Sequence, residues 1–313
     1  MDFALVFPGQ GSQKPGMGRD LFDAHPAAAG IFRAADDALG VSLSSLCFDG
    51  PADTLMETHN AQPALLTHGI AMWRLLSDRF GAHVRCTAGH SLGEFTAHVA
   101  AGTFDFETAV RLVRTRGELM QAAGTARPGA MAAILGDIDV RVRELCEQAS
   151  REAGVVVPAN FNSPGQVVVS GEVAGVDRLI ELAKEHGARK CIKLQVSGAF
   201  HSPLMEAARP EFTAALDAAT MRDATLPVYA NVTGRQVMQA RQSRRLLGEQ
   251  MTSPVRWTET IRNIAEDFPG IVFIELGPGN VLGGLIRKIV PDATVHPAGT
   301  VANLDAILEL PVA

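Results

Sequence analysis

The chain has 313 residues, of which 47% are hydrophobic and 20% charged, and its formal net charge is −6. This composition is typical of a globular protein, and the acidic balance argues against a nucleic-acid-binding surface. No run approaches eighteen apolar residues and the start MDFALVF lacks a basic signal region, so we expect no membrane segment and a cytoplasmic location. The four cysteines form no C-x-x-C pair, which favours reduced, structural thiols over a zinc site or disulfides.

A short apolar run at residues 3–7 is followed by Pro8 and Gly9, which predicts a buried parallel strand that ends in a loop. Ligands bind at the carboxyl ends of strands in open α/β sheets, so the loop FPGQGSQ is a candidate site. It lacks the G-K-[ST] ending of a phosphate cradle, and Lys14 stands where a dinucleotide loop needs glycine. A plain turn and a rim of hydrogen-bond donors around a reaction remain as interpretations.

Residues 21–80 carry apolar side chains at helical spacing and predict mostly helices that face a core. A short strand is then predicted at 84–88, a tight turn at 89–93 and an alanine-rich helix at 94–101. Gly102 stands where a helix C-terminus prefers glycine. The chain therefore passes from strand to turn to helix without an intervening loop.

This turn reads GHSLG, a G-x-S-x-G pentapeptide whose glycines permit a sharp bend that exposes the serine side chain. The pentapeptide alone favours a plain Gly-Ser turn, but the flanking strand and helix favour Ser91 as a nucleophile. The amide of Leu92, at the helix start, would face a substrate oxyanion. A metal site at His90, Glu94 and His98 is rejected because the outer pair on one helix would be ~12 Å apart.

A nucleophilic serine needs a base, and histidine is the usual one. The sequence has nine histidines, of which His201 stands out because its loop, SGAFHSP, follows a predicted strand. That loop would share the carboxyl edge of the sheet with Ser91. The residues alone make His201 the favoured candidate among several.

From about residue 127 the pattern changes to strand, helix, strand, strand, helix, strand, which is the ferredoxin-like order. We therefore expect a small domain at residues 127–196 inserted into a larger domain made of 1–126 and 197–313. The expected strands are 130–135, 155–157, 166–171 and 190–196, and the expected helices are 140–152, with Asp139 as N-cap, and 176–186. Further strands of the larger domain are expected at 227–231 and 271–276.

Several longer motifs follow one another along the chain. They are FPGQGSQ, GHSLGE at 89–94, LVRTRG at 112–117, NFNSPGQVVVSG at 160–171, GAFHSPLM at 198–205, SPVRW at 253–257 and ELGPGNVLGGL at 275–285. With them the chain resembles malonyl-CoA:acyl carrier protein transacylases over nearly its whole length. The resemblance implies an α/β-hydrolase-like large domain with an inserted ferredoxin-like small domain.

The same resemblance implies a ping-pong acyltransferase of fatty-acid synthesis. Malonyl would pass from coenzyme A to Ser91, and then to the phosphopantetheine thiol of acyl carrier protein, with His201 as general base. Backbone amides of Gln10 and Leu92 would form the oxyanion hole, and the backbone carbonyl of Gln250 would orient the histidine. No cofactor or metal is implied beyond the coenzyme A thioester and the carrier's own phosphopantetheine, and a monomer is expected.

Substrate selection is also implied by the resemblance. Arg116 would pair with the free carboxylate of malonyl, for which guanidinium geometry is suited, although its spacing alone fits an ordinary arginine on an amphipathic helix. Bulk at Leu92 and Phe200 resembles the malonyl-selective rather than the methylmalonyl-selective pattern. Asn160 and Asn162 would border the cleft from the small domain, where either residue could instead cap a turn.

Other functions stay open at the level of sequence. The closest alternatives share the chemistry: a discrete malonyl transferase of a polyketide assembly line, or the malonyl-loading subunit of a malonate decarboxylase. A serine hydrolase or thioesterase would use water as the acceptor, and a scaffold with a relic site would not react at all. Arg116 discriminates, because a carboxylate-binding arginine has no general use in a lipase.

Overall fold

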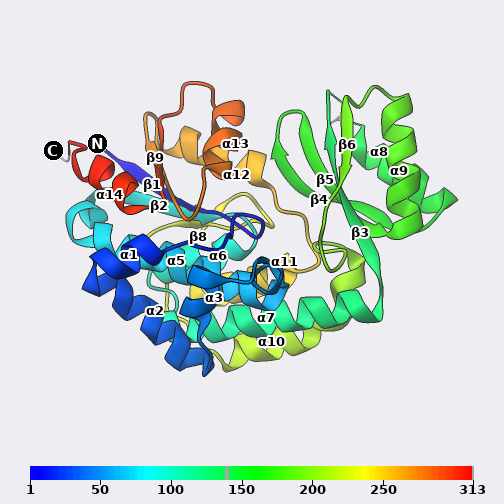
Figure 1. Cartoon of the computed structure of the whole chain (residues 1–313). Helices are drawn as coiled ribbons and strands as arrows, with labels where there is room; N and C mark the ends of the chain where they lie inside the picture. Colours follow the sequence, from blue (N-terminus) through cyan, green and yellow to red (C-terminus); the bar gives the residue numbers. More distant parts are fainter. Residues whose placement is uncertain (138–140, 312–313) are drawn as a thin grey trace.

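The computed structural model describes residues 1–137 and 141–311 (Figure 1). Its larger sheet has the strand order β10-β9-β1-β2-β7-β8, and its neighbouring strands are parallel except for the β7–β8 pair. The predicted parallel strand at the start of the chain is confirmed, and it lies in the middle of this sheet. The strands are β1 (Phe3–Phe7), β2 (Val84–Gly89), β7 (Val228–Tyr229), β8 (Gln236–Val237), β9 (Val272–Leu276) and β10 (Val295–Ala298).

Helices cover both faces of this sheet. All five side chains of β1 are buried, although successive side chains of a strand point to opposite faces. Phe3, Leu5 and Phe7 pack in the core that contains α2, α5 and α6, whereas Ala4 and Val6 pack in the core that contains α12 and α13. The helices of this part are α1 (Arg19–Ala24), α2 (Pro26–Leu39), α3 (Leu43–Asp49), α4 (Ala52–Met56), α5 (Thr58–Phe80), α6 (Leu92–Ala100), α7 (Phe106–Ala126), α10 (Arg209–Ala218), α11 (Ala240–Gln250), α12 (Trp257–Asp267), α13 (Val281–Ile289) and α14 (Val301–Leu308), with short 3₁₀ helices at Gly81–His83 and Pro203–Ala208.

A second, antiparallel sheet with the order β4-β5-β3-β6 stands beside the first (Figure 1, green). Ala132 and Ile134 of β3 pack against its two helices, whereas Met131 faces the opposite side. Its elements are β3 (Gly129–Leu135), α8 (Val142–Glu152), β4 (Val156–Ser163), β5 (Gln166–Glu172), α9 (Val173–Glu185) and β6 (Lys190–Lys193). The predicted helix start at Asp139 and Val140 lies outside the described residues.

The expected strand at 190–196 is too long, since β6 ends at Lys193. Antiparallel pairing with β3 stops there, and the amide of Leu194 makes a last bond to the carbonyl of Met131 (2.9 Å). Leu194, Gln195 and Val196 then line a cavity instead of extending the sheet. This segment therefore serves as the return connection from the second sheet to the first.

The second sheet is also joined through main-chain hydrogen bonds to a segment between α11 and α12 of the larger part of the chain. Phe161 of β4 donates to the carbonyl of Val255 (2.9 Å), and the amide of Val255 donates to the carbonyl of Ala159 (2.8 Å). The SPVRW segment thus extends alongside β4 and fixes the second sheet over the carboxyl edge of the first. The candidate site lies in the space between them.

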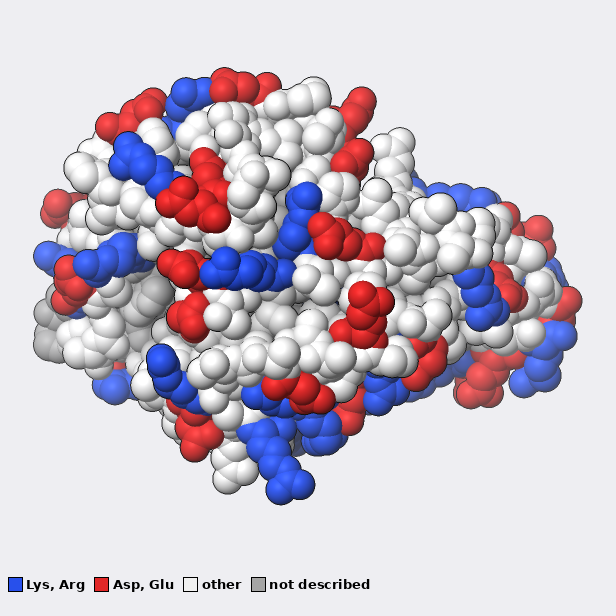
Figure 2. Space-filling view, turned by 90° about the horizontal axis from the view of Figure 1, so that it is seen from below, with Lys and Arg blue, Asp and Glu red and all other residues white. Residues whose placement is uncertain are grey.

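Acidic and basic side chains intermingle on the molecular face in Figure 2. Exposed ion pairs of the chain, such as that of Arg74 and Asp78 (3.4 Å), contribute only ~0 to 1 kcal/mol each. Stability therefore comes mainly from the apolar layers on both sides of the large sheet. None of the described helices combines the length and apolarity needed to cross a lipid bilayer.

Candidate active site

Ser91 lies at the bend between β2 and α6, where two glycines permit close packing. A Cβ on Gly89 would lie 1.9 Å from the backbone of Gly93, and a Cβ on Gly93 would lie 2.1 Å from the carbonyl oxygen of Phe7. Ser91 has φ 51° and His201 has φ 57°, and no other non-glycine residue has positive φ in the described part of the chain. Such backbone strain costs about 1 to 3 kcal/mol per residue and gathers at functional sites.

Asn231, at the end of β7, stabilises this bend through its side-chain amide. Its Oδ1 accepts from the Ser91 amide (2.7 Å), and its Nδ2 donates to the carbonyl of Gly89 (2.7 Å). One buried side chain therefore holds both ends of the turn. Nothing in the sequence motif pointed to Asn231, although a polar residue at the carboxyl end of a strand was a usable signal.

His201 is placed to act on Ser91. Its Nε2 lies 2.7 Å from Ser91 Oγ, while Nδ1 lies 2.9 Å from the carbonyl oxygen of Gln250 and 3.1 Å from that of Ser253. Because both carbonyls are acceptors, Nδ1 carries the proton and Nε2 is free to accept from the serine hydroxyl. The structure thus places Gln250 where the sequence resemblance implied, and adds Ser253, which sequence reasoning missed.

The pKa of His201 is lowered to about 3, first by burial and then by the positive charge of Arg116. The imidazole is therefore neutral near pH 7, as a general base must be. His201 is 3% exposed, so it is largely shielded from water.

Arg116, on α7, is buried in the same site. Its Nη2 donates to Ser91 Oγ (3.2 Å) and to Gln250 Oε1 (2.8 Å), and its Nη1 donates to Gln62 Oε1 (2.7 Å). Its Nε has no hydrogen-bond partner within the part of the chain that the structure describes. Burial lowers the pKa of Arg116 to about 10, so it remains a cation near pH 7. A buried cation with an unused donor is suited to bind a carboxylate.

The FPGQG loop lies against the bend and brings Gln10 to the same cavity as Leu92. The Gln10 side chain donates to Thr58 Oγ1 (3.2 Å), and the Gly11 amide donates to Gln13 Oε1 (2.7 Å). Leu92 is the first residue of α6, where helical N–H groups have no intrahelical acceptor. Both residues of the expected oxyanion hole therefore line the cavity that contains Ser91.

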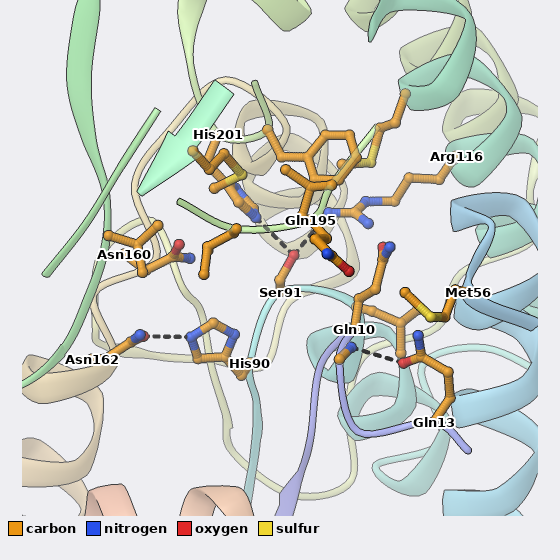
Figure 3. A pocket seen from close by; sticks show the side chains of 18 residues that line it. Gln10, Gln13, Met56, His90, Ser91, Arg116, Asn160, Asn162, Gln195 and His201 are labelled. Carbon is orange, nitrogen blue, oxygen red and sulfur yellow. Dashed lines mark hydrogen bonds between the residues drawn. The ribbon is translucent and has the colours of Figure 1, made fainter. Parts of the chain in front are cut away.

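A cavity of about 340 Å³ surrounds these groups, and Figure 3 shows Ser91 pointing between His201 and Arg116. Phe200 and both predicted asparagines, Asn160 and Asn162, line it. Asn162 Oδ1 lies 2.8 Å from His90 Nε2, which links the second sheet to the serine bend. The remaining lining side chains of the second sheet and its return segment are Met131, Val168, Leu194, Gln195 and Val196, which the sequence did not single out.

The described residues hold no group of three or more His, Cys, Asp or Glu side chains that could bind a metal ion. The three residues of the rejected metal motif have other contacts. His90 forms a hydrogen bond with Asn162, and His98 Nδ1 forms one with Thr103 Oγ1 (3.1 Å). Glu94 accepts a hydrogen bond from Gln250.

Comparisons with known proteins show to which family the chain belongs. Residues 4–303 match the acyl transferase domain family. The malonyl CoA-acyl carrier protein transacylase of Bacillus subtilis (strain 168) is 46% identical over 287 residues, which cover 91% of this chain and 90% of that protein. The corresponding protein of Escherichia coli (strain K12) is 41% identical and covers 98% of this chain and 99% of its own length.

Solved structures show the same relationship. The acyl-carrier-protein S-malonyltransferase of Bartonella henselae superposes with a TM-score of 0.93 at 40% identity, covering 98% of each chain. A malonyl-transacylase solved with its type II PKS acyl-carrier protein superposes with a TM-score of 0.94 at 40% identity, covering 99% of each chain. The chain therefore belongs to the malonyl-CoA:acyl carrier protein transacylase family, within the acyl transferases.

Proposed function

We propose that this protein transfers malonyl from coenzyme A to the phosphopantetheine thiol of an acyl carrier protein through a malonyl-serine intermediate. One observation carries the proposal: Ser91 Oγ lies 2.7 Å from His201 Nε2 and 3.2 Å from Arg116 Nη2. A nucleophile is thus held between a neutral base and a fixed cation. The family relationship supports the same reaction.

In the first half-reaction His201 Nε2 takes the proton from Ser91 Oγ, which attacks the thioester carbonyl. The tetrahedral oxyanion accepts hydrogen bonds from the backbone amides of Gln10 and Leu92, and each such donor is typically worth ~2.7 to 4 kcal/mol. Collapse expels the coenzyme A thiolate, which takes the proton from the imidazolium. The carrier's thiol then attacks the malonyl ester by the same steps in reverse.

Arg116 supplies selectivity for malonyl in this proposal. Its Nη2 lies beside Ser91 Oγ, so the guanidinium can bind the substrate carboxylate there in place of the serine hydroxyl, while Gln62 and Gln250 hold the guanidinium in place. Acetyl lacks that carboxylate and gains nothing from the contact. The side chains of Leu92 and Phe200 limit the room for a branched acyl group, and Asn160 and Asn162 border the acyl group from the second sheet.

We also propose a domain division of the fold. Residues 1–126 and 197–313 form an α/β-hydrolase-like domain, and residues 127–196 form a ferredoxin-like insertion. The parallel sheet with helices on both faces supports the first assignment. The order β3-α8-β4-β5-α9-β6, with its helices on one face of the sheet, supports the second.

The partners of the reaction follow from its chemistry. Malonyl-CoA is the donor and acyl carrier protein the acceptor, so the enzyme itself needs no cofactor. We further propose, from the family resemblance, that it acts in fatty-acid synthesis, as a monomer and in the cytoplasm. A polyketide carrier is a second candidate, because a structural neighbour was solved with a type II PKS carrier. A competition assay with one carrier of each kind separates them by the initial rate of malonyl loading.

The acceptor distinguishes this proposal from hydrolysis. We expect purified protein and malonyl-CoA to form a serine-bound malonyl group that phosphopantetheine thiols discharge much faster than water does. The measurement is the release of malonate and of malonyl-thioester from isolated acyl-enzyme, with and without thiol. Rapid release of free malonate in the absence of thiol would overturn the transferase proposal in favour of a hydrolase.

A further inference from the structure

A buried carboxylate that the proposed reaction does not use lies directly beneath the nucleophile. Glu94 is in the first turn of α6 and is fully buried, and its amide donates to the carbonyl of Ser91 (3.1 Å). Burial raises the pKa of its carboxyl to about 7, against the opposing effects of Gln250, Asn231 and Arg116. Burying a carboxyl group costs folding free energy unless the group is hydrogen-bonded. The hydrogen bonds of Glu94 therefore indicate its role.

Both of its hydrogen-bond donors are residues that hold the catalytic groups. Glu94 Oε2 accepts from Gln250 Nε2 (2.6 Å) and from the backbone amide of Asn231 (3.1 Å). Its Oε1 has no partner among the described residues. A single carboxylate oxygen therefore ties together two chain segments that are far apart in sequence.

The first of these partners, Gln250, contacts every member of the reacting group. Its backbone carbonyl accepts from His201 Nδ1 (2.9 Å), and its side-chain Oε1 accepts from Arg116 Nη2 (2.8 Å). Its Nε2 also donates to the carbonyl of Ser91 (3.0 Å). Moving this one glutamine would displace the base, the cation and the nucleophile together.

The second partner, Asn231, fixes the strained bend. Its side chain bonds to the amide of Ser91 and to the carbonyl of Gly89, while its own amide is held by Glu94. The positive φ of Ser91 persists only where surrounding bonds impose it. Glu94 is therefore linked to Ser91 by two chains of hydrogen bonds, one through Gln250 and one through Asn231.

We propose that Glu94 is a positioning residue, which holds Ser91, His201 and Arg116 in their reactive arrangement by accepting hydrogen bonds from Gln250 and Asn231. This inference rests on the proposed malonyl transfer. Glu94 contacts neither the acyl group nor the cavity, so it acts only through those two neighbours.

A second buried carboxylate provides a matched control. Glu275 is also fully buried, and its oxygens accept from the amides of Leu282 (3.0 Å) and Gly283 (2.7 Å) at the start of α13. Burial raises its pKa as well. It stabilises a helix terminus and bonds to none of the reacting residues, so Glu275→Gln reports the cost of losing a buried carboxylate as such.

The experiment compares steady-state transfer of malonyl and acetyl from coenzyme A by the wild type, Glu94→Gln, Glu94→Ala and Glu275→Gln. For Glu94→Ala we expect kcat to fall about 10²-fold with both acyl groups, since misplacement of reacting groups by about 1 Å has effects of this size. KM should rise for malonyl-CoA alone, because Arg116 also shifts. Glu94→Gln keeps an acceptor oxygen and should retain activity within about tenfold, while Glu275→Gln should match the wild type within about twofold.

A double-mutant cycle tests the route through Gln250. The Glu94→Ala/Gln250→Ala variant should lose clearly less activity than the product of the two single losses, because both changes remove the bond between Glu94 and Gln250. The bond from Asn231 is lost only with Glu94→Ala, so some further loss in the double variant is expected. Additive losses would overturn the inference, and so would equal kinetics for Glu94→Ala and Glu275→Gln, or equal damage in Glu94→Gln and Glu94→Ala. A wild type that transfers no malonyl would instead refute the proposed function, so the two failures are distinguishable.

Discussion

The two walls of the active-site cavity are built differently. On the side of the large sheet, Ser91, His201 and Arg116 each make hydrogen bonds to buried partners, and two of the three hold a positive φ. On the side of the second sheet, the wall consists mostly of apolar side chains such as Met131 and Val168. The first wall has a connected hydrogen-bond network, which can hold reacting groups in one geometry. The second wall has apolar side chains, which can determine the shape of the substrate that fits the cavity.

The walls meet at few polar contacts. His90 bonds to Asn162, and Val255 pairs with β4 through its main chain. Since Ser253 and Gln250 on the same segment accept from His201, the second sheet abuts the segment that orients the base. The comparison predicts large effects from changes in the first wall and small effects from changes in the second.

The largest effect in this comparison is expected from the base. His201→Ala should slow acylation of Ser91 by about 10²- to 10⁴-fold, because no other described group lies on the serine hydroxyl as a neutral acceptor. Single-turnover mixing with malonyl-CoA measures this rate. His186→Ala is the control, since its ring caps α9 on the second sheet and should leave the rate unchanged. Loss below tenfold for His201→Ala would contradict its role.

Arg116→Ala should lower kcat/KM for malonyl-CoA by about 10²-fold, the equivalent of about 3 kcal/mol for a charge-assisted contact. Acetyl transfer should be unchanged or improved, because acetyl has no carboxylate to bind. Arg111→Ala serves as control, since that side chain lies exposed on the same helix beside Glu107. Equal losses with malonyl and acetyl would refute carboxylate recognition.

The pH dependence of acetyl transfer should show the effect of the Arg116 charge on the pKa of His201. The pKa of His201 is lowered to about 3 by burial and by this cation, so the imidazole stays neutral down to low pH. We expect kcat/KM for acetyl-CoA to lack a histidine acid limb from about pH 5 to about pH 8. Without the cation the pKa rises, so the acid limb of Arg116→Ala should move to higher pH. Profiles extended down to about pH 3 in which the acid limbs of the two proteins begin at the same pH would contradict this coupling.

The smallest effect is expected in the second wall. Asn162→Ala removes the partner of the half-buried His90 ring and should lower the free energy of unfolding by about 1 kcal/mol. Malonyl transfer should stay within about threefold of the wild type. Denaturant unfolding and the transfer assay measure the two quantities side by side. A loss of activity close to that of His201→Ala would show that the second sheet takes part in the chemistry.

The sequence predicted those parts of the molecule that short-range patterns encode. The bend at Ser91 follows from two glycines between a strand and a helix, and the second sheet follows from its order of strands and helices. The strand prediction failed at 194–196, because apolar residues that line a cavity have the same pattern as residues that pack in a sheet.

The bonds that hold the site come from distant segments, and local pattern does not encode them. Asn231 lies 140 residues from Ser91, and Gln250 lies 156 residues from Glu94, so only the folded chain brings them together. The role of Gln62 could not be predicted for a similar reason, since its bond to Arg116 joins α5 to the packed helix α7. The motifs singled out the candidate reacting residues, and the family resemblance also singled out Gln250. The supporting residues Asn231 and Gln62 required the tertiary structure.

The most direct test of the account is the mass of the intact protein after brief incubation with malonyl-CoA, with the wild type beside Ser91→Ala. The wild type should gain the mass of one malonyl group, which a phosphopantetheine thiol then removes. Ser91→Ala should gain nothing while remaining folded. The same adduct on both proteins, or on neither, would contradict the claim that Ser91 carries the acyl group.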